Sequence, residues 1–257
     1  MATRFGIAMC AFAGSDCFPS NFMQRHLIFG CAILVLFNPI AYLVRAADAP
    51  ANQLTDSESA AGWRLLFDGK TMEGWRSFKK DTFPAKGWVV EDGILKKVAN
   101  VRGGDIITTN EFNDFDFQWD WRIAPKANNG IKYFITEERA QAVGHEYQML
   151  DDSVIDIKKE KTASFYDVLP PSDDAPVKPP GEWNHSRVLV QGDHVEHWLN
   201  GAKVLEYECG SEAVKAAIAK SKFRNVKGFG DKIKGHILLT DHRDEAWFRN
   251  LKIRELK

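Results

Sequence analysis

The sequence predicts an all-β protein, built as an antiparallel sandwich or jelly roll of two sheets with one short helix. Short apolar runs bounded by turn residues recur along the chain, one nine-residue stretch alternates strictly, and a single stretch has helical composition. Many short strands in succession pack as two sheets around a common core. The chain has no Gly-x-Gly-x-x-Gly loop, Walker loop, Cys-x-x-Cys pair or His-Glu-x-x-His motif, which argues against the cofactor chemistries of those motifs.

The clearest strand covers residues 115–123. Its apolar positions are Phe115, Phe117, Trp119, Trp121 and Ile123, and these alternate with Asp116, Gln118, Asp120 and Arg122. Successive side chains of a strand point to opposite faces, so strict alternation over this length indicates a strand with one buried face. We expect the aromatic face to pack on a second layer, and the polar face to meet water or to line a cleft that binds sugars.

The remaining strands follow from apolar runs that end at turn residues. In chain order we expect strands over residues 63–67, 88–90, 94–96, 187–190, 195–199, 203–207, 236–240 and 247–253. The three between 187 and 207 form a meander, because Gly192-Asp193 and Asn200-Gly201 favour tight turns. The alanine-rich residues 211–223 predict the helix, with Ser211 as its N-cap.

The first 46 residues are predicted to be a secretory signal segment. A basic start at Met23–His26 precedes an unbroken apolar run over Leu27–Phe37, and Val44-Arg45-Ala46 ends in small residues typical of a cleavage site. Met23 is itself a suitable start, so residues 1–22 are interpreted as an upstream start assignment. The apolar run is shorter than the ~20 residues of a membrane span, so we expect no stable span after cleavage and a periplasmic or secreted protein. The alternative is an uncleaved anchor in which Ile40–Val44 extend the apolar run.

After the signal we expect a linker over residues 47–61 and one β-sandwich domain over residues 62–257. The whole chain carries 34 Lys+Arg and 35 Asp+Glu with the two signs interspersed, which argues against a nucleic-acid partner. Cys209 is the one cysteine beyond residue 46 and is predicted to be a buried structural thiol. His194 and His197 flank a predicted hairpin and are expected to be exposed.

One predicted strand, residues 144–151, carries acid–base side chains in an otherwise apolar pattern. Glu146 and Gln148 share one face, whereas His145 points to the other face and is expected to pack there. Asp151 is out of phase with Glu146 unless a β-bulge near residues 149–150 brings it back, and bulges often lie beside active sites. The alternative is that these carboxylates are ordinary solvated residues of a sheet surface.

A proline-rich stretch precedes the meander. Five of the ten prolines lie at Pro170, Pro171, Pro176, Pro179 and Pro180, just before Gly181-Glu182-Trp183-Asn184. Such a stretch is stiff and cannot donate ladder hydrogen bonds. It is suited to form the wall of a pocket beside a sheet edge, and a purely structural crossover is equally allowed.

Several segments, in this order, resemble the 3-keto-disaccharide hydrolase domain family, which has the concanavalin-like lectin/glucanase jelly roll. The resemblance extends over most of residues 62–256. The segments that carry it are Leu66–Lys70 with Gly74-Trp75, Trp88–Gly93, Asn129–Ile131, Glu146–Asp151, Gly181–Asn184, Trp198–Gly201, Gly235–His242 and Phe248–Leu251. None is specific alone, but the ordered set is.

The resemblance implies cleavage of glycosides whose C3 hydroxyl has been oxidised to a ketone. The ketone acidifies the C2 proton, so a base can remove it, the C1 substituent leaves, and water adds back. It implies Glu146 and His242 for proton transfer, with Asp151 and Asp241 as charge or metal partners, because a divalent cation could stabilise the enolate. It further implies Gln148, Asn129 and Lys132 as partners of sugar hydroxyls and Tyr166 and Trp183 as stacking groups.

Two other functions remain open from the sequence. The first is an ordinary glycosidase with Glu146 and Asp151 as paired carboxylates, although residues five apart in an extended strand are separated by roughly 13 to 17 Å. Retaining glycosidases need about 5.5 Å between their carboxylates. The second is a non-catalytic carbohydrate-binding module, which would need Trp183 and Tyr166 but not Glu146 or His242.

Overall fold

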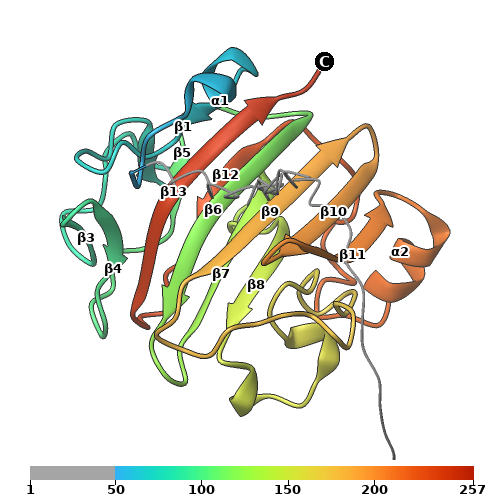
Figure 1. The fold of residues 1–257 in the computed structure, drawn as a ribbon. Helices are drawn as coiled ribbons and strands as arrows, with labels where there is room; N and C mark the ends of the chain where they lie inside the picture. Colours follow the sequence, from blue (N-terminus) through green and yellow to red (C-terminus); the bar gives the residue numbers. More distant parts are fainter. Residues whose placement is uncertain (1–49) are drawn as a thin grey trace, which may run out of the picture. The chain divides into compact units, whose positions relative to one another are not determined.

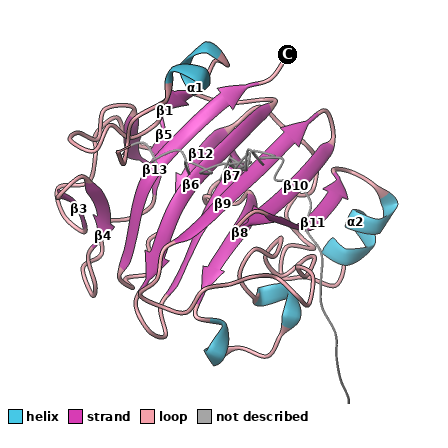
Figure 2. Ribbon diagram, viewed as in Figure 1, coloured by secondary structure: helices cyan, strands magenta, loops and turns pink. Residues whose placement is uncertain are grey.

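The computed structural model describes residues 50–257, which form two stacked antiparallel sheets (Figure 1, Figure 2). The larger sheet contains β1 (Arg64–Leu65), β3 (Trp88–Glu91), β4 (Ile94–Lys97), β6 (Phe115–Ile123), β9 (Asn184–Gln191), β10 (His194–Leu199), β11 (Ala202–Glu208) and β13 (Ala246–Glu255). The smaller sheet contains β2 (Trp75–Ser77), β5 (Ile106–Thr108), β7 (Asn128–Ile135), β8 (His145–Leu150) and β12 (His236–Leu239). The predicted all-β jelly roll is confirmed, and the predicted signal segment lies outside the described residues.

Strands that are distant in sequence are neighbours in both sheets. The larger sheet has the order β11-β10-β9-β6-β13-β4-β3, with β1 also paired to β13, and the smaller has the order β2-β5-β12-β7-β8. Figure 1 shows the C-terminal β13 lying along β6. The meander β9-β10-β11 is present as predicted, and its hairpin turn at Asn200 and Gly201 has the positive φ angles, 48° and 88°, of a tight primed turn.

The core lies between the two sheets. The five apolar residues of β6 are almost fully buried, as its alternation predicts, and their rings meet the smaller sheet. The Trp119 ring packs edge-on against Tyr147 at 4.9 Å between centroids, and Trp119 Nε1 donates to Met149 Sδ at 3.5 Å. Tyr147 and Met149 therefore fix which face of β8 is the core face.

The helices differ from the prediction in number and length. The predicted C-terminal helix is α2 (Glu212–Ile218), capped by Ser211 as expected, but it ends before residue 223 because the Ser221 hydroxyl donates to the Ile218 carbonyl. A second helix, α1 (Asp56–Ala60), and the short 3₁₀ turns η1 (Asp152–Val154) and η2 (Lys158–Glu160) were not predicted. No helix among residues 50–257 is long and apolar enough to cross a membrane.

The linker expected over residues 47–61 is wrong from Asn52 onward. Asn52 is 7% exposed, its amide N–H donates to Asn250 Oδ1 at 2.6 Å, and Asn250 returns a bond of 2.8 Å to Asn52 Oδ1. Thr55 and Glu58 then form a capping box at α1. Side-chain hydrogen bonds thus attach this polar stretch to β13, although it has too few apolar residues to be recognised as folded.

Of two predictions about single side chains, one is confirmed and the other is wrong. Cys209 is buried as expected, and burial raises the pKa of its thiol to about 12. His197 was expected to be exposed, but it is fully buried. It occupies the inward phase of β10, together with Val195 and Leu199, and its Nδ1 lies 2.9 Å from the Ala163 carbonyl oxygen.

Candidate active site

The strand that carries Glu146 is β8, paired along its length with β7. Glu146 lies opposite Lys132 and Gln148 lies opposite Gly130, in a regular antiparallel register. Because Tyr147 faces the core, these side chains occupy the outer face of the smaller sheet. The predicted shared face of Glu146 and Gln148 is therefore present, and the register with β7 adds Lys132 to it.

The Glu146 carboxylate is enclosed yet sparsely paired. Its side chain is 6% exposed, and the nearest cation, Lys132 Nζ, is 3.9 Å from Oε2. Within residues 50–257 the carboxylate accepts no hydrogen bond. A Cβ placed on Gly130 would lie only 2.4 Å from Glu146 Oε1, so glycine at this position lets the carboxylate lie directly over β7.

Residues 163–166 extend the sheet beyond β8. Ala163 N–H donates to the Gln148 carbonyl at 2.8 Å, and Tyr166 N–H donates to the Glu146 carbonyl at 3.0 Å. Phe165 bridges to Tyr147 on the core side. Alternation then puts Ser164 and Tyr166 on the same outer face as Glu146, which brings the predicted Tyr166 beside the predicted base.

Two buried polar atoms of this face lack a partner. Gln148 Nε2 donates to Asn128 Oδ1 at 3.2 Å, but Gln148 Oε1 and the neighbouring Ser164 Oγ make no hydrogen bond within the described chain. Native proteins leave few such atoms unsatisfied, so each one needs an explanation. Together with the Glu146 carboxylate they form a set of acceptors and a hydroxyl that suits a ligand rich in hydroxyl groups.

Positive charge and a protonated phenol surround Glu146. Lys222 Nζ lies over the Tyr166 ring, 4.0 Å from its centroid. Burial lowers the pKa of this ammonium group, against the opposing attraction of Glu146 and Asp167. Burial, helped by the nearby Glu160, Glu146 and Asp167 charges, raises the pKa of Tyr166 to about 12, so its hydroxyl stays protonated at neutral pH.

Asp151 does not join Glu146, and the predicted bulge is absent. The β7–β8 register runs without a shift to Leu150, so Asp151 keeps the opposite phase. It caps η1 instead: its carboxylate accepts from Ser153 Oγ at 2.7 Å and from Lys126 N–H at 2.8 Å. These bonds lower the pKa of Asp151, first through Ser153 and then through Lys126.

Asn129 and Asp241 were predicted to line the site but serve the fold. Asn129 is fully buried on the core side of β7, where its side chain bonds Thr240 and the Gly130 N–H. Asp241 forms a buried ion pair of 2.9 Å with Lys97 and accepts from the N–H groups of Gly103 and Gly104. Both side chains are consumed by internal bonds, so neither prediction holds.

His242 makes no hydrogen bond or ion pair with the cluster around Glu146, and Trp183 lies on the other sheet. His242 is exposed in the loop after β12 and makes no hydrogen bond or ion pair within residues 50–257, so its role stays a prediction. Trp183 packs against Arg122 and Arg249, whose side chains project from the outer face of the larger sheet. That face is opposite to the face that bears Glu146, so the predicted stacking role of Trp183 at this site is wrong.

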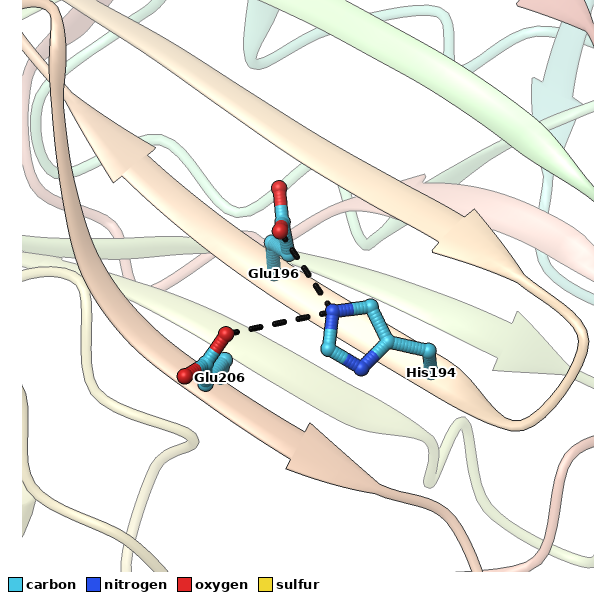
Figure 3. Close-up of side chains that lie close together, drawn as sticks. All are labelled: His194, Glu196 and Glu206. Carbon is cyan, nitrogen blue, oxygen red and sulfur yellow. Dashed lines mark hydrogen bonds and ion pairs between the residues drawn. The ribbon is translucent and has the colours of Figure 1, made fainter.

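The residues around Glu146 do not fit a metal centre with three or more protein ligands. In the described part of the chain, the one group of His, Cys, Asp and Glu atoms close enough together is His194, Glu196 and Glu206, on β10 and β11 (Figure 3). His194 Nε2 is 3.4 Å from Glu196 and 4.0 Å from Glu206. Lys203 pairs with both glutamates and Trp198 Nε1 also donates to Glu196, so these carboxylates have partners without an ion.

The proline-rich loop lines a hollow, as its stiffness predicts, but Glu146 is not part of it. The hollow has a volume of about 290 Å³. It is lined by the ends of β6 and β8 with Asp151–Ser153 and by Val177–Pro180. Trp121 and Ile123 belong to this lining, so the hollow opens between the ends of the two sheets.

Ser164 and Lys222 were missed in the sequence. Ser164 comes after β8 and an irregular loop. No local sequence pattern indicates that the chain returns there to the edge of β8. Lys222 lies within the predicted helix over residues 211–223 and was given no role in a site. The one available signal was Gly130, a glycine within an otherwise apolar strand, which often marks a close approach to its backbone.

Comparisons with known proteins found a matching sequence family and similar structures. A sequence profile described as a 3-keto-alpha-glucoside-1,2-lyase-like domain matches residues 62–254. A 3-keto-disaccharide hydrolase of Bacteroides thetaiotaomicron is 32% identical over 248 residues, which are 83% of this chain and 84% of the relative. Two crystal structures of Parabacteroides distasonis proteins assigned to the glycosyl hydrolases are also similar. They have TM-scores of 0.73 and 0.62 at 34% and 28% identity, over 81% and 76% of this chain and 100% and 99% of those chains.

Proposed function

The chain belongs to the 3-keto-alpha-glucoside-1,2-lyase-like family, and from this premise we propose that it cleaves glycosides oxidised at C3, with Glu146 as the base. The coarser activity, a carbohydrate hydrolase, follows from the family itself. The observation that carries the proposal is one enclosed carboxylate, without a hydrogen bond, in contact range of Lys132 and beside unpartnered Gln148 and Ser164 atoms.

The reaction begins with transfer of the C2 proton to Glu146. The electron pair of that C–H bond forms the enolate of the C3 ketone and then expels the C1 oxygen, which takes a proton as it leaves. Water adds across the resulting C1–C2 double bond: its hydroxide bonds to C1, its proton restores the acid that protonated the leaving oxygen, and Glu146 returns its proton to C2. The sum is hydrolysis, without oxidant or reductant, and a positioned base contributes about 10²–10⁴-fold to such a step.

The remaining roles follow from charge and protonation state. Lys132 and Lys222 supply the positive charge that stabilises an enolate, which is the role expected of a metal ion in the sequence-based prediction. We assign the acid to the Tyr166 hydroxyl, because it stays protonated and lies in the Glu146 cluster. Gln148 Oε1 then accepts a hydrogen bond from a sugar hydroxyl, and Ser164 Oγ accepts or donates one.

The two alternatives have less support. An ordinary glycosidase needs a second carboxylate beside Glu146, and Asp151 is used as a helix cap on the other phase of the strand. A binding module built on Trp183 and Tyr166 needs both rings on one face, and these two residues lie on opposite sheets.

The test compares Glu146→Gln with Glu196→Gln, the same chemical change on the opposite face. Purified proteins are incubated with a 3-keto-glucoside and with its unoxidised parent, and keto-sugar loss and aglycone release are followed. We expect Glu146→Gln to lose at least 100-fold in turnover with an unchanged melting temperature, and Glu196→Gln to stay within threefold of the wild type. Near-normal turnover in Glu146→Gln, or cleavage of the unoxidised parent, would contradict the proposal.

We further propose export, on the basis of the signal predicted over residues 1–46. N-terminal sequencing of the protein from cell-envelope and medium fractions tests this. A mature chain that begins near Ala47 is the expected result, and a full-length chain confined to the cytoplasm would contradict it.

A further inference from the structure

Trp183 belongs to a set of stacked arginine and tryptophan side chains on the outer face of the larger sheet. Arg249 lies over the Trp183 ring at 4.2 Å from its centroid, and Arg122 lies over the same ring at 5.0 Å. Arg122 also lies over the Trp247 ring at 4.6 Å. All four side chains are partly exposed, so Trp183, Arg122, Trp247 and Arg249 form one surface cluster, called here the Arg122 platform.

Arg122 differs from the other arginines of this face. Arg187 and Arg254 both pair with Asp116, at 2.7 and 3.1 Å, and Arg249 pairs with Asp120 at 3.2 Å. Arg122 has no ion pair and no hydrogen bond within residues 50–257, and its Nε is a buried nitrogen without a partner. A permanent positive charge is therefore held between two indole rings without an ion-pair partner among residues 50–257.

This arrangement leaves the guanidinium edge available. Stacking on aromatic rings uses the faces of the planar group, whereas its N–H donors lie in the plane and match a carboxylate in a bidentate fork. Each indole ring already has two cations over it, since Lys96 Nζ also lies over the Trp247 ring, 5.7 Å from its centroid, so a ligand meets the exposed edges of the indoles. A sugar ring that bears a carboxylate satisfies both features at once, because its carboxylate would bind Arg122 and its ring would contact the exposed indole edges.

We propose that the Arg122 platform is a second carbohydrate-binding site, specific for uronate residues of an acidic polysaccharide. It lies on the sheet face opposite Glu146, so it holds the protein on a polymer without occupying the proposed catalytic site. This proposal does not depend on the mechanism at Glu146. It gives Trp183 a carbohydrate-binding role different from the catalytic-site role that the sequence suggested.

The test uses affinity electrophoresis and calorimetry with polygalacturonate, a neutral glucan and dextran sulfate as probes. Arg122→Gln removes the unpaired charge. Arg187→Gln is the matched control, because it removes a stacked arginine of the same face, 5.3 Å from the Trp198 ring, whose charge Asp116 already neutralises. Arg122→Lys keeps the charge but loses the fork, and it serves as the second variant if Arg122→Gln unfolds.

We expect the wild type to bind polygalacturonate more tightly than the other two polymers, with affinity that falls as salt rises. Arg122→Gln should lose at least tenfold in affinity and Arg122→Lys at least threefold, while Arg187→Gln stays within twofold. All variants should turn over a small 3-keto-glucoside normally. Equal binding by Arg122→Gln, an equal loss in Arg187→Gln, or preference for the neutral or sulfated polymer would overturn the proposal.

Discussion

At the scale of single residues, the site depends on a close approach that only glycine permits. Gly130 lies beneath the Glu146 carboxylate, which is held over the β7 backbone and lies near Lys132. The backbone of Gly130 is not in the left-handed region, so its value here is the missing side chain and not its conformational freedom. Because Gly130 has no Cβ, the carboxylate of the proposed base can occupy this position over the neighbouring strand.

We predict that Gly130→Ala lowers turnover without unfolding the protein. The new methyl group would meet Glu146 Oε1 at 2.4 Å, and the flexible carboxylate can move away from it. Displacement of a catalytic group by about 1 Å costs up to about 10²-fold in rate. Turnover and melting temperature measured on the same sample check this. Unchanged turnover would show that the close approach of Glu146 to Gly130 is not needed for catalysis.

At the scale of elements, the loop after β8 supplies half of the proposed site. Asp151 turns the chain out of β8 into η1, and Thr162 then fastens its return, because the Thr162 hydroxyl donates to the Leu150 carbonyl at 2.9 Å. Residues 163–166 can pair with the β8 edge only if this loop closes. Asp151 thus acts on the site through the loop and not through the substrate.

We predict that Asp151→Ala destabilises the fold more than it slows the reaction. It loses the cap bonds to Lys126 and Ser153, and loss of a helix cap costs about 1–2 kcal/mol. We expect less than a tenfold fall in turnover, against at least 100-fold for Glu146→Gln. Asp151→Asn retains an acceptor and should recover part of the stability in urea unfolding. A loss of turnover in Asp151→Ala as large as that in Glu146→Gln would restore Asp151 as a catalytic residue.

At the scale of the folded unit, a buried hydrogen-bond chain joins the two sheets. His197 lies 2.7 Å from the Tyr133 hydroxyl, which lies 2.6 Å from the Tyr207 hydroxyl, which lies 2.8 Å from His145 Nδ1. Because the Ala163 carbonyl can only accept, His197 Nδ1 carries the proton at that end. Tyr133 therefore donates to His197 Nε2, Tyr207 donates to Tyr133, and His145 Nδ1 donates to Tyr207. Both histidines are neutral.

We predict that this chain makes the fold sensitive to acid. Burial lowers the pKa of His145 to about 3 and that of His197 to about 4, whereas an unfolded histidine has a pKa of about 6.5. The unfolded state therefore binds protons that the folded state does not. The free energy of unfolding falls as the pH drops from about 6.5 towards 4, by about 3 kcal/mol for each histidine at most.

Urea unfolding at pH 7.5, 6, 5 and 4.5 measures this dependence. His145→Phe replaces one buried histidine among the rings of Phe165 and Phe229 and should give a flatter pH profile than the wild type. Identical profiles for the two proteins, or a midpoint that does not change with pH, would contradict the prediction.

Most of the fold could be predicted from the sequence, because local patterns report local geometry. The alternation in β6, the turns of the meander and the Ser211 cap each depend on a few consecutive residues, and all three are present. The stretch 52–61 was missed because its attachment depends on two asparagines 198 residues apart, Asn52 and Asn250. Polar contacts over that separation leave no periodic signal.

The sequence by itself determined the jelly roll, its family, and the face shared by Glu146 and Gln148, since strand alternation is a property of neighbours. Tertiary structure alone decided which other groups meet that face. It brought Ser164, Tyr166 and Lys222 to Glu146, and it assigned Asp151, Asn129 and Asp241 to internal bonds and Trp183 to the opposite sheet. The reason is physical: loop closure and sheet stacking join residues far apart in the chain, and no pattern of consecutive residues encodes which ones meet.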